Sequence, residues 1–387
     1  MFFRSNAICP QSLQGLSDSR PDPGFSIITI QTEKELRSRW SQIMELYEHA
    51  RDRNIFFEPW LLESVFTHQL SVCSMRIIAT TRDDGALTGL YPIQTIRRFA
   101  PLLTAIPSLL RHSHCFLSHP ILRIGKAEDS LRQFLRWQDQ TYGRAAIEFR
   151  NIPDESECAK ILRQFNEKRE RLVYRYGSYY RPFHDLQGQR PWLQAPLRKE
   201  IGRKTRRLLE QRNVAVEVWN RSQPIHSWID QFLELEVSGW KGRANSAILQ
   251  NPDETAYFRS VIHKAAYCNR LIAVRLVARN VVIASRFSLT QDNVVYSYKT
   301  AYDEAFSHVS PGLLLEIENL NYLRSRHLYH GIDSCSEAHH PMFDRLYNSR
   351  TGLAHYLVSS ATHRSKLFLS GFSFLRENLS KSRDRAS

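Results

Sequence analysis

The most constraining feature of the sequence is a succession of β-rich runs in its second half. The runs cover residues 271–278, 281–289 and 293–302. Short polar segments at Arg279-Asn280 and Thr290-Gln291-Asp292 separate them. Runs of this length, divided by turn residues, predict an antiparallel meander of three strands.

Helices are expected on both sides of this meander. Apolar residues at helical spacing predict helices over residues 225–238 and 253–267 before it. After it come the triplet Ser310-Pro311-Gly312, a helix that begins near Pro311, and a β-rich run ending at Asp333. The first half repeats this alternation of helices and β-rich runs over about 160 residues. The fold class predicted from these patterns is therefore α+β.

The length of 387 residues favours two or three domains. We expect a leader over residues 1–24, an N-terminal domain over 25–188 and a C-terminal domain over 189–387. The leader breaks its few apolar residues with polar ones and does not resemble a secretion signal. No stretch approaches the ~20 apolar residues of a membrane-spanning helix.

The charge of the chain favours an anionic partner. Lys and Arg number 53 against 39 Asp and Glu, which gives a net charge of +14. A basic helix is expected over about 192–212, and a solvated helix face is its simplest interpretation. The phosphates of a cofactor, an acidic carrier protein or an anionic membrane surface come second, and tRNA comes third. Aromatic residues are not arranged around it as in a nucleic-acid site, so nucleic acid is an unlikely partner.

The cysteines bear on the cellular compartment. The 6 cysteines are scattered and form no CxxC pair, so a reducing cytoplasm is the simpler assumption. Histidines cluster in two places, but without the paired spacing of a zinc module, and no metal is expected.

Three separated segments resemble a known family. They are Ser238-Gly239-Trp240-Lys241-Gly242-Arg243, the run from Tyr298 to Glu304 followed by Ser310-Pro311-Gly312, and Gly331-Ile332-Asp333. Together they resemble the CelD/BcsL-like acetyltransferases, and Phe57-Glu58-Pro59-Trp60-Leu61 is similar to a first-half segment of that family. The resemblance spans about residues 25–355. It implies two tandem GNAT-like domains, related to the FemABX peptidyltransferases, and acyl-CoA as donor.

The resemblance places the acyl donor at Ser310, Pro311 and Gly312. Serine is a suitable N-cap and proline a suitable first helical residue, and a helix N-terminus favours an anion. The sequence lacks the Q/RxxGxG/A phosphate loop of ordinary GNAT enzymes, so an acyl carrier protein is the alternative donor. Trp240 would form a flat wall for the acyl chain. Lys241 could hold a phosphate or carboxylate. A plain helix cap and a core tryptophan are the structural alternatives.

Several side chains could accept the proton of an attacking amine. They are Glu236, Tyr302, Asp303, His308 and Asp333. Strand-end carboxylates are also common structural caps, so each has a structural alternative. A competing motif, HHxxxD at residues 339–344, would instead make His340 the base and Asp344 its partner. Arg345 stands where that second class of acyltransferase usually has glycine.

These patterns predict an N-acyltransferase that transfers an acyl group directly in a ternary complex. The acceptor would be the amine of an amino sugar, an amino lipid or a similar molecule. The protein would be cytoplasmic, with peripheral membrane association as one option. The non-catalytic alternative is a GNAT-like scaffold or regulator of envelope polysaccharide production.

Overall fold

The computed structural model describes residues 25–68, 75–97, 105–143, 146–188, 193–211 and 213–362. The expected leader and the end of the tail lie outside these residues. The chain forms two compact units, residues 1–178 with 353–387 and residues 179–352. These bounds differ from the expected boundary at 188/189 because the division falls within two long strands, β7 (Val173–Asp185) and β13 (Ser349–Val358).

The first unit is a mixed sheet with helices packed against it. Its strands are β1 (Phe25–Ile30), β2 (Arg76–Arg82), β3 (Leu87–Arg97), β4 (Ala105–Leu109), β5 (Ile121–Leu122) and β6 (Ile147–Pro153). Its helices are α1 (Glu33–Ser38), α2 (Trp40–Glu48), η1 (Ile55–Phe57), α3 (Pro59–His68), α4 (Ala127–Tyr142) and α5 (Glu157–Glu167). The strand order is β1-β2-β3-β4-β6-β13-β7, with β5 paired to β3. Helix α4 lies against β1, β2 and β3, and α5 lies against β6.

The core of the first unit follows from the apolar spacing of these elements. Helix α4 buries Leu131, Phe134 and Leu135 on one face, and the Phe134 ring stacks on Tyr91 with centroids 4.0 Å apart. Acidic residues occupy the first turn of α4, where they complement the positive end of the helix dipole. The apolar faces of these helices and strands therefore pack together as the core of the first unit.

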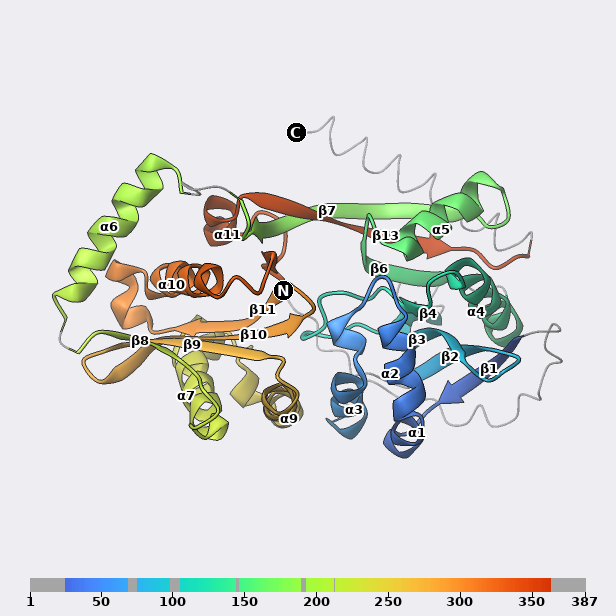
Figure 1. Cartoon of the computed structure of the whole chain (residues 1–387), viewed down its shortest axis with the longest axis horizontal. Helices are drawn as coiled ribbons and strands as arrows, with labels where there is room; N and C mark the ends of the chain where they lie inside the picture. Colours follow the sequence, from blue (N-terminus) through green and yellow to red (C-terminus); the bar gives the residue numbers. More distant parts are fainter. Residues whose placement is uncertain are drawn as a thin grey trace. The chain divides into compact units, whose positions relative to one another are not determined.

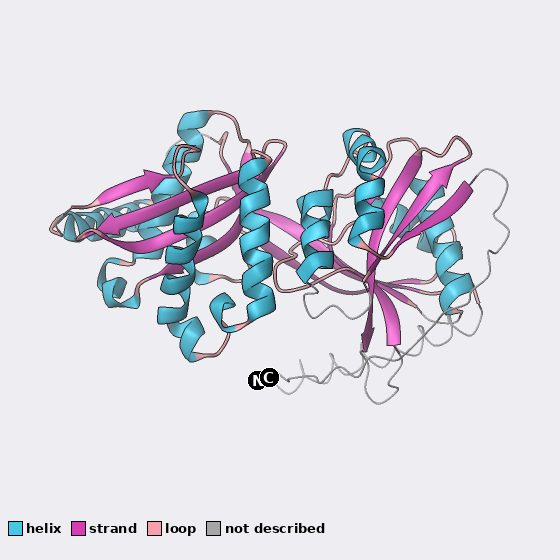
Figure 2. Ribbon diagram, turned by 90° about the horizontal axis from the view of Figure 1, so that it is seen from below, coloured by secondary structure: helices cyan, strands magenta, loops and turns pink. Residues whose placement is uncertain are grey.

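The second unit repeats the arrangement. Its strands are the end of β7, β8 (Ala215–Val218), β9 (Leu271–Ala278), β10 (Val281–Gln291), β11 (Val294–Tyr302) and β12 (Gly331–Asp333), in the order β7-β12-β11-β10-β9-β8. Its helices are α6 (Ala195–Leu209), α7 (Ile225–Ser238), α8 (Trp240–Arg243), η2 (Ile248–Gln250), α9 (Pro252–Tyr267), η3 (Glu304–Val309), α10 (Pro311–Arg326) and α11 (Pro341–Leu346). The predicted meander is confirmed as β9, β10 and β11. Helix α10 lies on one face of this meander and α7 and α9 on the other (Figure 1). Figure 2 shows helices packed on strands in each unit from a second direction.

In both units a central helix follows three strands and leads to a strand that pairs parallel with the third of them. In the first, α4 follows β2, β3 and β4 and precedes β6, which pairs parallel with β4. In the second, α10 follows β9, β10 and β11 and precedes β12, which pairs parallel with β11. Helices α4 and α10 are therefore equivalent positions in a repeated fold.

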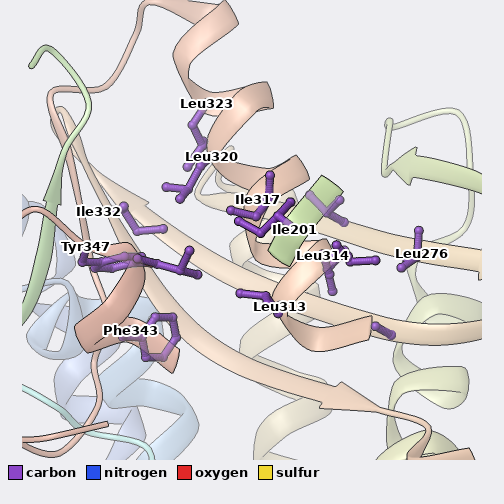
Figure 3. Packing of buried hydrophobic residues seen from close by; sticks show 14 of the residues in the cluster. Ile201, Leu276, Leu313, Leu314, Ile317, Leu320, Leu323, Ile332, Phe343 and Tyr347 are labelled. Carbon is purple, nitrogen blue, oxygen red and sulfur yellow. The ribbon is translucent and has the colours of Figure 1, made fainter. Parts of the chain in front are cut away.

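Aliphatic residues of α10 form the centre of the second core. Leu314, Ile317 and Leu320 are buried between the sheet, Ile201 of α6, and Phe343 and Tyr347 near α11 (Figure 3). Helix α6 contributes Leu197, Ile201 and Leu208 and leaves its basic residues other than Lys204 exposed. This packing fixes both α6 and α10 to the same face of the sheet.

The end of the chain differs from the sequence-based expectation. The mixture of Phe, Leu, Lys and Arg from Gly352 onward predicts a weakly amphipathic helix, but residues 352–358 belong to strand β13. This strand pairs antiparallel with β6 from Leu353 to Val358. The pairing explains the error, because a partner about 200 residues away in sequence overrides a weak helical pattern. Among the described residues, no helix is long and apolar enough to cross a membrane.

Candidate active site

The N-terminus of α10 has a geometry suited to an anionic ligand. Ser310 precedes the helix in the left-handed region, with φ 51°, and Pro311 begins it. The first turn carries no acidic residue. A Cβ added at Gly312 would lie 3.2 Å from Cδ1 of Tyr302, so the helix start packs directly on the end of β11. The backbone N–H groups of this turn are the donors that a phosphate would use.

A lysine from the basic helix reaches the same place. Lys204 Nζ donates to Ser310 Oγ at 2.7 Å and lies 2.9 Å from Glu200 Oε1. The other oxygen of Glu200 pairs with Arg345 of α11. Lys204 and Arg345 together hold the pKa of Glu200 below its usual range. The sequence favoured a solvated face for α6, with the phosphates of a cofactor among the second choices, and it did not indicate that Lys204 would contact a residue 106 positions away in the chain.

Strand β12 is short and pairs with only the first residues of β11. Their parallel pairing covers Val294 to Tyr296 on β11, and β11 then continues to Tyr302. A β-bulge interrupts the β10–β11 ladder, because Phe287 pairs with Lys299 and Ser288 pairs with Ser297, which leaves Tyr298 as the extra residue. Backbone groups at a bulge are partly released from the ladder. The end of β11 thus extends beyond its pairing with β12, to the point where Tyr302 lies beside the start of α10.

Asp333 lies at the end of β12, as predicted, but is held in a buried ion pair. Its Oδ2 lies 2.6 Å from Nη2 of Arg181, and both side chains are almost fully buried. Its Oδ1 accepts a hydrogen bond from the N–H of Cys335 at 2.9 Å. Burial, and next to it the charge of Asp333, raises the pKa of the Cys335 thiol, so that thiol stays protonated at neutral pH. The structure therefore gives Asp333 a positioning partner that the sequence did not indicate.

Glu236 and Lys241 also lie together. Lys241 Nζ is 2.6 Å from Glu236 Oε1, and the N–H of Ile248 donates to Glu236 Oε2 at 2.8 Å. Lys299 of β11 is within electrostatic range of both. Burial and then the charge of Lys241 lower the pKa of Lys299 to about 8, against the opposing effect of Glu236. A lysine with that pKa is partly neutral near physiological pH and can accept a proton.

The Trp240 segment is anchored beside the end of β11. The N–H of Trp240 donates to Glu304 Oε1 at 2.9 Å, and Glu304 Oε2 pairs with Arg243 at 2.6 Å. The indole of Trp240 is 53% exposed, so it is not a core tryptophan. A Cβ at Gly242 would lie 1.8 Å from the carbonyl oxygen of Val237, which excludes any larger residue there. Glu304 thus holds the Trp240 segment beside the end of β11, where Tyr302 lies against Gly312 of the predicted donor segment.

A second buried charge network lies under α10. Arg286 of β10 pairs with Glu316 of α10, and both are almost fully buried. Tyr347 Oη donates to Glu316 Oε1 at 2.9 Å, and Arg286 Nε donates to Ser288 Oγ at 3.0 Å. Sequence reasoning missed this network, although a charged residue inside an apolar β-rich run, such as Arg286, is a usable signal.

The remaining predicted residues have different surroundings. Asp303 caps η3 by accepting a hydrogen bond from the N–H of Ala305 at 2.8 Å. His308 is exposed and stacks near Phe306. In the HHxxxD motif, His340 is the N-cap of α11, and Asp344 Oδ1 lies 2.9 Å from Arg350 Nη2. Burial lowers the pKa of His340, which favours the neutral ring.

The first unit has a pocket of about 460 Å³ at the starts of α4 and α5. Two of its lysines face carboxylates, since Lys126 lies 3.9 Å from Asp129 and Lys160 lies 3.8 Å from Glu155. These carboxylates balance the charge of the two lysines, as Glu200 does for Lys204 at the start of α10. No group of His, Cys, Asp and Glu in the described part of the chain could hold a metal ion.

Comparison with known proteins shows which protein family the second unit resembles in sequence. Residues 195–339 match the family described as an acetyltransferase (GNAT) domain. The second unit carries a GNAT domain. This match makes the protein an acyltransferase, and it confirms the predicted α+β GNAT-like fold. Among curated proteins, no sequence matches this chain.

Solved structures extend the similarity of fold over most of the chain. The C-terminal domain of a putative lysylphosphatidylglycerol synthetase from Agrobacterium fabrum is 12% identical, with a TM-score of 0.51 over 88% of this chain and 97% of that one. FemX is 10% identical, with a TM-score of 0.54 over 86% of this chain and 96% of that one. The relation to FemABX-type folds expected from the sequence is supported at the level of fold.

Proposed function

We propose that this GNAT-type enzyme transfers an acyl group from a thioester to an amine. The donor would be acyl-CoA or an acyl carrier protein, and the acceptor an amino sugar, an amino lipid or a similar molecule. The CelD/BcsL-like resemblance favours this assignment within the GNAT class. The observation that carries the proposal is the start of α10, where Ser310, Pro311 and Gly312 form a helix N-terminus with no acid in its first turn. Lys204, which also pairs with Glu200, donates to Ser310 there.

The donor would bind with its phosphate at this helix start. Backbone N–H groups and the Lys204 ammonium replace the phosphate loop that the sequence lacks. The thioester arm would then run along β11, where the edge beyond Tyr296 is not paired with β12. An extended amide-containing arm can hydrogen-bond to such an edge as an added strand does. Trp240 and Lys241 would wall the acyl group and the acceptor.

The chemical step is direct attack by the amine nitrogen on the thioester carbonyl. A new C–N bond forms, the C–S bond breaks, and the thiolate leaves with the carrier. Backbone N–H at the β11 bulge would stabilise the oxyanion. The amine proton would pass to a nearby acceptor, for which Tyr302, Asp303 and Lys299 lie on or next to β11. Asp333 and Glu236, whose carboxylates are held by Arg181 and Lys241, would position this strand end.

Donor binding tests the proposal. Thermal shift and native mass spectrometry with CoA, acyl-CoAs and an acyl carrier protein should show binding of at least one donor. Replacing Gly312 by leucine should weaken that binding, because its Cβ would displace Tyr302 and obstruct the anion. Full donor affinity in a folded Gly312→Leu variant would exclude this site. Failure of every donor to bind would favour the scaffold alternative.

Activity on one acyl donor tests the chemistry. Combined loss of Tyr302, Asp303 and Asp333 should lower kcat by about 10²–10⁴-fold while donor affinity changes less. The HHxxxD alternative predicts instead that His340→Ala abolishes turnover. Circular dichroism on each variant checks folding, which matters for Asp333 because its removal leaves Arg181 buried. If all variants keep near-full activity, catalysis depends on positioning and backbone polarisation alone.

A further inference from the structure

Helix α6 presents an exposed basic face that the donor site does not use. Its inner face packs through Leu197, Ile201 and Leu208, and Lys204 points toward Ser310. Most of the charged side chains on its outer face are positive. The exposed cations are Arg198, Lys199, Arg203, Arg206 and Arg207. Glu200 is engaged with Lys204 and Arg345, so Glu210 at the C-cap is the one acid on this outer side within the described helix.

Exposed aliphatic side chains gather at the C-terminal end of this face. Leu209 ends α6 and is 63% exposed, Val216 on β8 is 42% exposed, and Val281 at the start of β10 is 51% exposed. Aliphatic side chains this exposed, beside a row of cations, form a surface that is both charged and apolar.

Hydrogen bonds connect the segment that follows α6 to the turn between β9 and β10. Gln211 Oε1 accepts from Nε of Arg279 at 2.7 Å, and Asn213 Nδ2 donates to Asn280 Oδ1 at 2.9 Å. The β9–β10 turn is therefore fixed beside the segment that follows α6, at the end of α6 from which the chain leads into β8 (Figure 1). Arg279 adds a further exposed cation next to Val281.

We infer that this face binds the surface of an anionic lipid bilayer. Cations near such a surface are attracted to its lipid headgroups, and a few aliphatic side chains enter the boundary between headgroups and acyl chains. A single-stranded nucleic acid would favour aromatic side chains for stacking, and α6 from Ala195 to Leu209 contains none. The combination of a basic helix and three exposed aliphatic residues fits a bilayer better. Membrane binding by α6 is independent of which donor occupies the α10 site.

Co-sedimentation of the full chain with vesicles tests this inference. Phosphatidylcholine vesicles that contain phosphatidylglycerol should bind the protein, pure phosphatidylcholine vesicles should bind it weakly, and salt should reduce binding. Replacing Arg203, Arg206 and Arg207 by alanine should lower the partition constant by about 100-fold, at about fivefold for each cation near the surface. These side chains are exposed, so the fold should be retained.

A control variant that loses the same charge elsewhere distinguishes binding by this face from a general effect of net charge. Alanine at Lys34, Arg163 and Lys168 removes the same charge from exposed positions of the first unit, and its partition constant should stay within about twofold of the wild type. Leu209→Ser with Val281→Ser should reduce the binding that remains at high salt. Equal losses in both alanine variants would overturn the inference. Binding of tRNA or duplex DNA through α6, without binding of anionic vesicles, would overturn it in favour of nucleic acid.

Discussion

Helices α4 and α10 occupy equivalent positions in the two units, but their first turns differ in charge. The first turn of α4 contains Glu128 and Asp129, which satisfy the positive end of the helix from within the chain. The first turn of α10 contains no acid, and Lys204 lies beside its N-cap. One copy of the fold therefore carries carboxylates in the first turn of this helix, and the other carries none.

Buried polar groups occur in both units, but their ion pairs differ in depth. The first unit buries a network of hydroxyls, in which Ser130 Oγ lies 2.7 Å from both Thr80 Oγ1 and Tyr91 Oη, and its pair of Arg171 with Asp139 keeps 9% and 18% of the two side chains exposed. The second unit buries its pair of Arg286 with Glu316 more completely, with 1% of each side chain exposed. Neutral hydroxyls stabilise packing, whereas buried charges are costly and are typical of sites that handle charge. The more deeply buried pair of the second unit is consistent with our proposal that this unit carries the chemistry.

The largest expected effect comes from breaking the buried pair of the second unit. Glu316→Gln leaves Arg286 buried without its counter-charge and should lower the free energy of unfolding by about 3–5 kcal/mol. Ser130→Ala in the first unit should cost about 1–3 kcal/mol. Urea denaturation measures both. The double variant Arg286→Met with Glu316→Leu should recover much of the loss, and equal costs in the two units would remove this contrast.

A smaller effect is expected at Lys299, whose pKa of about 8 lies below the ordinary value of 10.5. Below pH 8 the folded state carries the cost of a buried charge, and between pH 8 and 10.5 the unfolded state binds more protons, so wild-type stability should rise with pH. Lys299→Met should raise the free energy of unfolding at pH 7 by about 1–3 kcal/mol and remove that rise. Denaturation midpoints between pH 7 and 10.5 measure it. Parallel curves for the two proteins would contradict the lowered pKa.

Lys204 gives the next effect in size. Lys204→Ala should weaken binding of a phosphate-bearing donor by about tenfold, because it removes a charge-assisted hydrogen bond at the start of α10. Lys126 is the N-cap of α4, the equivalent helix of the first unit, so Lys126→Ala is the control for a lysine at that helix start and should leave donor affinity unchanged. Calorimetric titration distinguishes the two. A loss at Lys126 as large as at Lys204 would mean that the first unit also binds the donor.

The smallest effect concerns the residues that lead into the equivalent helices. Gly125, two residues before α4, has φ 72°, whereas Ser310, directly before α10, adopts φ 51° without being glycine. Gly125→Ser should cost about 1 kcal/mol, since a side chain disfavours this region. Ser310→Gly should relieve similar strain but lose the bond from Lys204. If thermal melting shows Ser310→Gly to be less stable, that bond outweighs the strain.

The sequence predicted those features of the fold that depend on residues close together in the chain. The three-strand meander, the helix beginning at Pro311 and the position of Asp333 at a strand end all follow from local periodicity and turn residues. Lys204 at Ser310, Arg181 at Asp333 and β13 on β6 could not be predicted, because each joins segments more than 100 residues apart. The hydrophobic pattern of one segment does not specify its distant partner. Lys299 was visible in a β-rich run, but its lowered pKa depends on Lys241 and Glu236 in the folded chain.

The pairing of β13 with β6 also sets an order of events during synthesis. Strand β6 leaves the ribosome about 200 residues before its neighbour from Leu353 to Val358 is made. Domains usually fold from the N-terminus as they emerge, and an unpaired strand edge is prone to aggregation. The first unit can therefore complete its sheet only after the entire second unit has been translated. A nascent chain stopped before residue 353 should remain sensitive to protease within its first unit, even though nearly all of that unit's residues are already present.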